Sequence, residues 1–274
     1  MGETAHQPVV VLLGAGRVAT HLVSSLLGSS YRVGQVWSRT IGSARGLAGP
    51  LGISYTDDLT AVVTDADIYI ACVTDEALPE VAGRLCERLS GRLSIAGGHP
   101  LFLHTAGSVP MDVWREAGAQ RYGILYPLQT FSKERAVDMS AVSLFVEASD
   151  ECALNAVEAL AYSLSDKVFY ADSRRRALLH IAAVFACNFT NAMYAAAHRL
   201  LATDNIPFEV LLPLIDETAA KVHSLTPRAA QTGPALRGDM AVMQKHMDAL
   251  ADDEELHAIY AQISNFIERN KCYE

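Results

Sequence analysis

The sequence predicts an α/β fold in which a doubly wound, mostly parallel sheet is followed by an all-α C-terminal region. Short apolar runs alternate with helical stretches from Pro8 to about Tyr170, which is typical of a parallel sheet covered by helices on both faces. After Ala171 the strand-like runs stop and only helical patterns follow. We therefore expect a sheet domain over residues 1–170 and a helical domain over 171–274.

The strands of the sheet domain are predicted from short runs rich in β-branched, aromatic and leucine residues. These runs cover residues 9–13, 31–37, 53–55, 67–73, 93–96, 101–104, 122–125, 142–146 and 168–170. Parallel neighbours need a long crossover connection, so the intervals between the runs are expected to hold helices.

The helical domain is predicted from capping residues and apolar spacing. Asp172 or Ser173 can cap a helix that runs unbroken to about Leu201, and Pro207 suits the first turn of another. A final amphipathic helix is indicated by apolar residues at helical spacing, namely Leu256, Ile259, Tyr260, Ile263, Phe266 and Ile267. The long helix is apolar on nearly every face, so we expect a homodimer formed through the C-terminal helices. A cleft between the two domains is expected to hold a small-molecule substrate.

Composition excludes several classes of partner. The chain has 22 Lys and Arg against 31 Asp and Glu, a net charge of −9, so no nucleic-acid partner is expected. The five cysteines form no CxxC pair, which indicates free thiols, a cytoplasmic address and no metal site; they are Cys72, Cys86, Cys152, Cys187 and Cys272. The apolar stretch near the N-terminus is too short for a signal peptide or a membrane span, so no membrane association is expected.

A glycine motif follows the first predicted strand directly. The strand at 9–13 leads into Gly14, Ala15, Gly16, Arg17, Val18 and Ala19, and then into a helical stretch. In this GxGxxA order the first glycine allows a tight turn, the second lets a diphosphate approach the backbone, and the small Ala19 lets helix and strand pack closely. The phosphates are expected at the helix N-terminus, and the domain is predicted to have the Rossmann fold. The alternative is a glycine-rich turn without a ligand.

Charge at the end of the second strand favours NADP(H) over NAD(H). An NAD site usually has an acidic residue about 20 residues after the glycine motif, but residues 4–56 contain none. Ser38, Arg39 and Thr40 stand there instead, and the Arg39 guanidinium suits a 2′-phosphate. The remaining cofactor contacts are expected from backbone at Val73 and Thr74 and from the small residues Thr105, Ala106 and Gly107.

Four further segments carry a family resemblance, and they are residues 104–110, 126–132, 180–188 and 232–239. With the glycine motif, they make the chain resemble the superfamily of pyrroline-5-carboxylate reductase, ketopantoate reductase and 6-phosphogluconate dehydrogenase-like proteins. It is most similar to a family with a Rossmann-like domain and a C-terminal domain of unknown function. The resemblance implies an NADP-dependent oxidoreductase with a helical, dimer-forming C-terminal domain, and it implies no particular substrate.

The catalytic residues of the better-known relatives cannot be carried over. Those enzymes use a lysine on the long helix and an asparagine one turn later, but residues 174–201 contain no lysine. At about 100° per residue, a polar stripe along this helix is predicted, formed by His180, Cys187, Asn191, Tyr194 and His198, with Asn188 at its edge. We expect His180 to protonate the substrate and Asn188 or Asn191 to orient it. The alternative is a structural histidine at the domain interface.

Polar residues near the strand ends are further candidates for substrate contact. His104, Ser108 and Gln129 lie at the ends of predicted strands or in the following loops, where ligands of α/β sheets bind. Arg237, in a loop of the helical domain, is the candidate clamp for a substrate carboxylate, unless it only pairs with Asp239.

The leading hypothesis is a cytoplasmic, homodimeric NADP(H)-dependent oxidoreductase that reduces a C=O or C=N bond of a small, anionic metabolite. A second hypothesis is a non-catalytic NADP(H)-binding redox sensor or interaction protein, because the helix lysine is missing. A third is hydride exchange between NADP and a deazaflavin, as in another relative.

Overall fold

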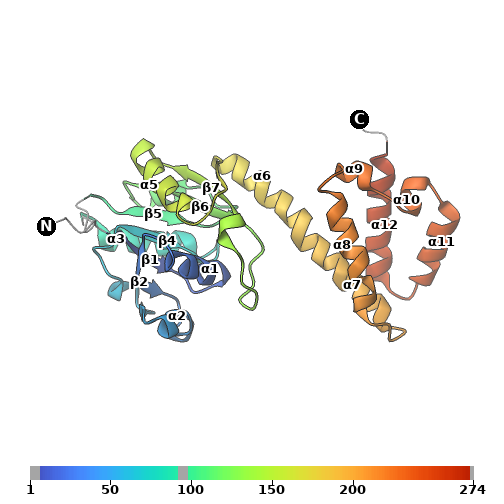
Figure 1. The fold of residues 1–274 in the computed structure, drawn as a ribbon, viewed down its shortest axis with the longest axis horizontal. Coiled ribbons are helices and arrows are strands. Elements are labelled where there is room, and N and C mark those ends of the chain that lie inside the picture. The colour runs from blue at the N-terminus through green and yellow to red at the C-terminus, as the bar shows by residue number, and fades with distance from the viewer. Residues whose placement is uncertain (1–6, 92–97, 272–274) are drawn as a thin grey trace. The chain divides into compact units, whose positions relative to one another are not determined.

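The computed structural model describes residues 7–91 and 98–271, and Figure 1 labels its elements. The expected strand at 93–96 and Cys272 lie outside the described residues. The chain divides into two compact units, the first extending to Cys187 and the second beginning at Asn188. The first unit holds the sheet, and the described part of the second is helical.

An eight-stranded sheet forms the centre of the first unit. Its strands are β1 (Val9–Leu13), β2 (Arg32–Trp37), β3 (Ser54–Thr56), β4 (Ile68–Ala71), β5 (Leu101–His104), β6 (Tyr122–Leu128), β7 (Ser143–Ala148) and β8 (Val168–Tyr170). Their order is β3-β2-β1-β4-β5-β6-β7-β8, and β1 to β6 are parallel in the order of a Rossmann fold. β7 pairs antiparallel with β6 and parallel with β8. The predicted fold class is confirmed.

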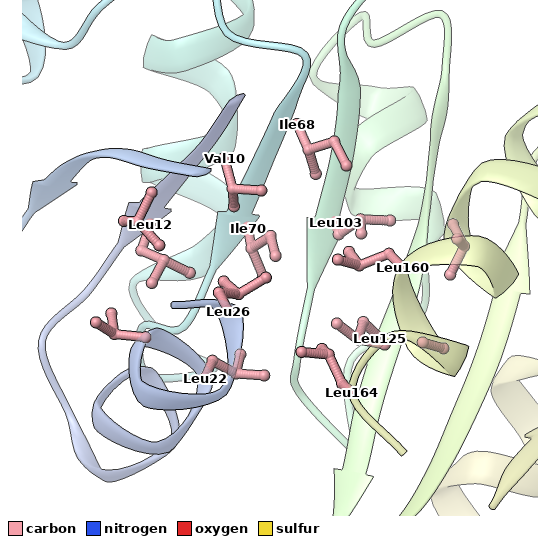
Figure 2. Close-up of a cluster of buried hydrophobic side chains, with 14 of the residues drawn as sticks. Val10, Leu12, Leu22, Leu26, Ile68, Ile70, Leu103, Leu125, Leu160 and Leu164 are labelled. Carbon is pink, nitrogen blue, oxygen red and sulfur yellow. The ribbon is translucent and has the colours of Figure 1, made fainter. Parts of the chain in front are cut away.

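Helices on both faces of the sheet bury two apolar clusters. The helices of this unit are α1 (Arg17–Leu26), α2 (Ile41–Ala48), α3 (Leu78–Leu89), α4 (Asp112–Glu116), α5 (Glu151–Tyr162) and α6 (Ser173–Ala183). Successive strand residues point to opposite faces, so Leu12 of β1 joins one cluster and Leu13 the other. Figure 2 shows the first cluster, with Leu26 of α1 near Ile70 of β4. The second cluster packs β1 and β4 against α3 and α4. This packing fixes the carboxyl ends of the parallel strands, where the site lies.

The described part of the second unit consists of the C-terminal part of the long helix and the shorter helices that follow it. Its helices are α7 (Thr190–Ala202), the 3-10 helix η5 (Phe208–Leu211), α8 (Leu212–Lys221), α9 (Pro227–Ala230), α10 (Pro234–Arg237), α11 (Met240–Ala249) and α12 (Glu254–Arg269). Arg199 of α7 pairs with Asp253 at 2.5 Å and Glu255 at 2.8 Å, which ties α7 to the start of α12. Pro207 precedes η5 as its N-cap residue and does not occupy the first turn of a helix, because the backbone remains extended there. The predicted final helix lies within α12.

The long helix contains an irregular segment. Helical structure runs from Ser173 to Ala202, with Asp172 as the N-cap that accepts from Arg175 N, but Val184–Phe189 is π-helical. A π-helical turn has i→i+5 hydrogen bonds, so the spacing of 100° per residue is not kept through it. The prediction of one regular polar stripe running from His180 to residues beyond this turn is therefore wrong.

By length and composition, this same helix is apolar enough to cross a membrane. None of its most apolar stretch is buried. Leu178 and Ile181 of α6 are 67% and 55% exposed. A large apolar surface therefore lies on this helix.

Candidate functional site

The glycine motif forms the turn between β1 and α1. Gly14 has a φ of +121°, and a Cβ there would collide with the backbone carbonyl of Cys72 after β4. Its N–H donates to the Trp37 carbonyl at 2.7 Å, which joins the turn to the end of β2. A Cβ at Gly16, the N-cap residue, would come no closer than 4.0 Å to another group, and no side chain caps α1. The glycine geometry therefore keeps the turn tight and leaves the amides at the start of α1 available for an anion.

A cavity of about 540 Å³ opens at this turn. Eight of the predicted cofactor residues line it, namely Gly14, Ala15, Gly16, Ser38, Arg39, Thr40, Val73 and Thr74. Six predicted contacts are not in its lining: Arg17, Val18, Ala19, Thr105, Ala106 and Gly107. Ala19 is instead fully buried where α1 packs on the sheet, the packing role expected of the motif's last residue.

The cavity suits an anion. Arg39, Arg84 and Lys133 line it, and Glu80, at 3.5 Å from Arg84, is the acidic side chain among the described lining residues. Three cations against one carboxylate favour a phosphorylated ligand. Thr40 Oγ1 accepts from Ser43 N at 3.4 Å and donates to Ser43 Oγ at 2.9 Å, so the turn that carries Arg39 is held by the cap of α2. These residues fit the predicted NADP(H) cofactor.

Sequence reasoning missed part of this lining. Ala77, Glu80, Val81 and Arg84 recur at helical spacing along α3, so one face of this helix borders the cavity. That spacing is visible in the sequence once the helix is placed. Lys133 comes from the loop after β6 and carries no local sequence signal for a nucleotide site.

A second polar group lies farther along the carboxyl edge of the sheet. Tyr126 Oη of β6 is 3.2 Å from Nδ1 of His180 on α6, and the two rings meet edge to face. A Cβ at Gly107 would come within 2.7 Å of His180 Nδ1 and 2.9 Å of Tyr126 Cζ. The glycine that was predicted to approach the nicotinamide therefore approaches this pair. Tyr126 was not among the predicted site residues, because its position opposite His180 depends on the tertiary fold.

Burial sets the protonation of Tyr126. The side chain is 7% exposed, and burial raises its pKa above the ordinary value, although the nearby Arg176 guanidinium acts in the opposite direction. The phenol therefore carries its proton at neutral pH and can donate to His180 Nδ1. In that arrangement the neutral imidazole carries its own proton on Nε2, the atom that can donate to a substrate.

His104 has a different environment. It is fully buried at the end of β5, and burial lowers its pKa to about 3. Its Nδ1 accepts from Ala106 N at 3.2 Å, and its Nε2 lies 3.4 Å from the Pro110 carbonyl. Because both nitrogens of this neutral imidazole contact the backbone of the 105–110 loop, His104 is better suited to hold that loop than to transfer a proton.

Ser108 and Gln129, the other candidates from the sheet side, are exposed. Ser108 Oγ donates to the Asp75 carboxylate, which joins the loop after β5 to the segment after β4 that lines the cavity. Gln129 Oε1 accepts from Thr130 N at 2.8 Å, so this side chain is folded onto its own loop. Ser108 thus lies between the nucleotide cavity and the Tyr126–His180 pair, and Gln129 begins the loop that carries Lys133.

The candidates from the helical part belong to the second unit. Asn188 lies in the π-helical segment and Asn191 in α7, and both are exposed. Arg237 ends α10 and is exposed, while Asp239 caps α11 by accepting from Val242 N at 3.2 Å. The structure does not place these residues relative to His180.

A buried ion pair fixes the start of α6 on the sheet. Arg176 is fully buried; its Nη1 lies 2.5 Å from Glu147 Oε2 of β7, and its Nη2 donates to the Val109 carbonyl at 2.6 Å. Ser173, in the first turn of α6, donates to Glu147 through its N–H at 3.1 Å and its Oγ at 2.9 Å. His180 lies four residues after Arg176, one turn further along α6. This network therefore sets where His180 meets Tyr126.

Comparisons with known proteins agree with this geometry. Residues 9–96 match the family described as NADP oxidoreductase, coenzyme F420-dependent, and residues 142–267 match a domain of unknown function, DUF2520. A crystal structure described as a "putative NADP oxidoreductase" from Bacteroides fragilis is 45% identical, with a TM-score of 0.89 over 96% of this chain and 99% of that one. At this identity and coverage, the chain belongs to the same NADP oxidoreductase family as the Bacteroides fragilis protein. A comparison with curated protein sequences finds no match.

More distant solved structures share the fold. A pyrroline-5-carboxylate reductase from Coxiella burnetii is 14% identical, with a TM-score of 0.56 over 97% of this chain and 98% of that one. An imine reductase from Myxococcus stipitatus in complex with NADP⁺ is 16% identical, with a TM-score of 0.63 over 96% of this chain and 92% of that one. For this member of the family, the predicted NADP(H) cofactor is thus supported by its own motif and by its relatives.

Proposed function

We propose that the protein is an NADPH-dependent reductase of a C=N or C=O bond in a small metabolite, with the Tyr126–His180 pair supplying the proton. The observation that carries this proposal is the 3.2 Å contact between Tyr126 Oη and His180 Nδ1 at the edge of the sheet that also carries the nucleotide cavity. Bound NADPH would supply the hydride, and the protein would supply position and the proton.

The roles of the chain's own residues follow from their positions. Gly14 to Gly16 would hold the diphosphate on the first amides of α1, and Ser38, Arg39 and Thr40 would hold the 2′-phosphate. His180 would pass its Nε2 proton to the substrate heteroatom while Tyr126 passes its own proton to Nδ1, so that the imidazole stays neutral and the phenol becomes a phenolate that solvent reprotonates. Asn188, Asn191 and Arg237 stay candidates for contact with an anionic substrate on the ground of the sequence pattern.

The relatives support the choice of reaction class. The solved structures that share the fold include pyrroline-5-carboxylate and imine reductases, which reduce C=N bonds. The match to the coenzyme F420-dependent family covers residues 9–96, which include the cavity lining apart from Lys133, and does not reach Tyr126 or His180. We therefore place a small C=N or C=O substrate ahead of a deazaflavin.

We also propose a cytoplasmic homodimer. Each unit exposes large apolar side chains, since Leu178 and Ile181 of α6 in the first unit and Leu214 of α8 in the second are each more than half exposed. A second copy would cover them through the C-terminal helices. The described cysteines Cys72, Cys86, Cys152 and Cys187 are free thiols, as expected of a reducing compartment.

The test is NADPH oxidation with a panel of cyclic imines and keto acids, using the wild type, H180A and Y126F. With a ketone, H180A is expected to lower kcat by about 100-fold or more, because carbonyl reduction needs an acid. With an imine that is already protonated, the same change should cost little. With a ketone, Y126F should also lower kcat, by less than H180A does.

Two results would contradict the proposal. If the wild type and H180A turned over a ketone substrate equally well, His180 would not be the proton donor. NADPH binding without turnover of any compound in the panel would favour the non-catalytic sensor.

A further inference from the structure

The loop between β6 and the 3-10 helix η3 (Met139–Ala141), residues 129–138, reaches the nucleotide cavity from a distant part of the sequence. We propose that Lys133 in this loop binds the cofactor diphosphate and that His21 of α1 positions it. This inference rests on the proposed cofactor site and assigns two residues that the glycine motif does not include.

The first observation is the place of Lys133. It lines the same cavity as Gly14, Ala15 and Gly16, and its side chain is exposed. The first turn of α1 holds no acidic residue and its N-cap makes no side-chain bond, so the amides at this end of the helix have no competing anion. An ammonium group beside free amides at a helix N-terminus is a combination that recognises phosphate oxygens.

The second observation is how the loop is fastened. His21 Nε2 is 2.8 Å from the backbone carbonyl of Ser132, the residue before Lys133. Since a carbonyl only accepts, His21 must donate from Nε2. The rings of His21 and Phe131 are 4.8 Å apart, and Phe131 packs against the apolar cluster under α1. His21 is 7% exposed, so the bond is shielded from water.

These contacts select the diphosphate and not the 2′-phosphate. Both groups of an NADPH molecule would lie in the cavity, at its glycine turn and at Arg39 respectively. The loop is fastened to α1, one helical turn past Arg17, and among the described residues no hydrogen bond joins it to the segment 38–43 that follows β2. The diphosphate is common to NADPH and NADH, whereas the 2′-phosphate belongs to NADPH alone, so the two assignments can be separated.

The experiment is calorimetric titration of the full chain with NADPH and with NADH. K133Q is expected to raise Kd about tenfold for both nucleotides, because one charge-assisted hydrogen bond is lost. K133R should keep most of the affinity. R135Q is the matched control, since Arg135 is an exposed cation of the same loop and the cavity lining does not include it; its Kd values should equal those of the wild type.

Three outcomes are decisive for Lys133. Equal Kd values for K133Q and the wild type would overturn the inference while leaving the proposed function in place. A loss confined to NADPH would also overturn it, by moving Lys133 to the 2′-phosphate. No binding of either nucleotide by the wild type would instead overturn the proposed function itself, and the inference with it.

His21 is tested through its dependence on Lys133. H21L removes the donor to Ser132, and H21Q keeps an amide donor of similar reach. In the wild-type background, H21L is expected to raise the Kd for both nucleotides, and H21Q is expected to raise it less. In the K133Q background, H21L is expected to cause no further rise in Kd. An unchanged Kd in H21L, or a full additional loss in H21L/K133Q, would show that His21 does not act through Lys133. If H21L fails to fold, H21Q with and without K133Q provides the same cycle.

Discussion

At the scale of single residues, burial separates the two histidines that the sequence offered for catalysis. His104 is enclosed at the end of β5 with its pKa lowered to about 3, while His180 is half-buried and contacts the Tyr126 hydroxyl. Both follow apolar runs in the sequence, and their environments differ only after folding. The sequence therefore nominated His180 as the proton donor and His104 as a contact for the substrate, but it could not show that His104 is fully buried.

The lowered pKa of His104 predicts a loss of stability in acid. The unfolded chain binds a proton at this histidine below about pH 6.5, whereas the folded chain does so only near pH 3, so stability falls as the pH drops between these values. His104 should contribute about 2 kcal/mol to the fall in free energy of unfolding between pH 6.5 and pH 5. H104Q should remove this contribution, which urea unfolding at the two pH values would measure.

The deciding quantity is the change in the free energy of unfolding with pH, compared between the wild type and H104Q. H104Q also changes the hydrogen bonds to Ala106 and Pro110, so its stability at pH 7 will differ from that of the wild type. A parallel fall in both proteins as the pH drops would show that His104 titrates normally in the folded state.

At the scale of elements, the strands followed from sequence because their apolar runs are short and bounded. β1, β5 and β8 have the bounds expected of them, and β6 is longer because it continues to Leu128 in its pairing with β7. The π-helical segment Val184–Phe189 could not be foreseen, since it contains no proline or glycine to mark an irregular turn. The loop that brings Lys133 to the cavity was equally hidden, because its course depends on contacts with α1.

The ion pair between Arg176 and Glu147 is the main polar connection between α6 and the sheet. R176M would leave Glu147 buried with only the Ser173 donors, so the free energy of unfolding should drop by about 3 to 5 kcal/mol. In R176M/E147L the loss should be smaller, because no buried charge remains. Urea unfolding of the three proteins tests this, and a double variant no more stable than R176M would contradict it.

At the scale of the whole molecule, the Rossmann order of β1 to β6 and a helical C-terminal part follow from the alternation of patterns along the chain. The sequence placed the boundary after residue 170, where β8 ends, whereas the compact units meet between Cys187 and Asn188, within the long helix. The sequence pattern shows where the sheet ends. The unit boundary depends on contacts, and the start of the long helix contacts the sheet.

The exposed apolar surface of α6 predicts self-association. The wild type should have twice the 29.6 kDa mass of the chain in light scattering, and L178E/I181E should be a monomer, because two charges on this surface oppose its burial. Y162E is the control, since Tyr162 at the end of α5 is 61% exposed and should leave the dimer intact. A monomeric wild type would remove the dimer from the proposal.

We expect the cavity at the glycine turn to select NADPH through Arg39. Calorimetric titration of the wild type and R39A with NADPH and NADH tests it most directly. We expect the wild type to bind NADPH more tightly than NADH, and R39A to lose most of that preference while its NADH affinity stays the same, because only NADPH carries the 2′-phosphate. Equal affinity of the wild type for the two nucleotides, or an unchanged preference in R39A, would show that Arg39 does not select NADPH.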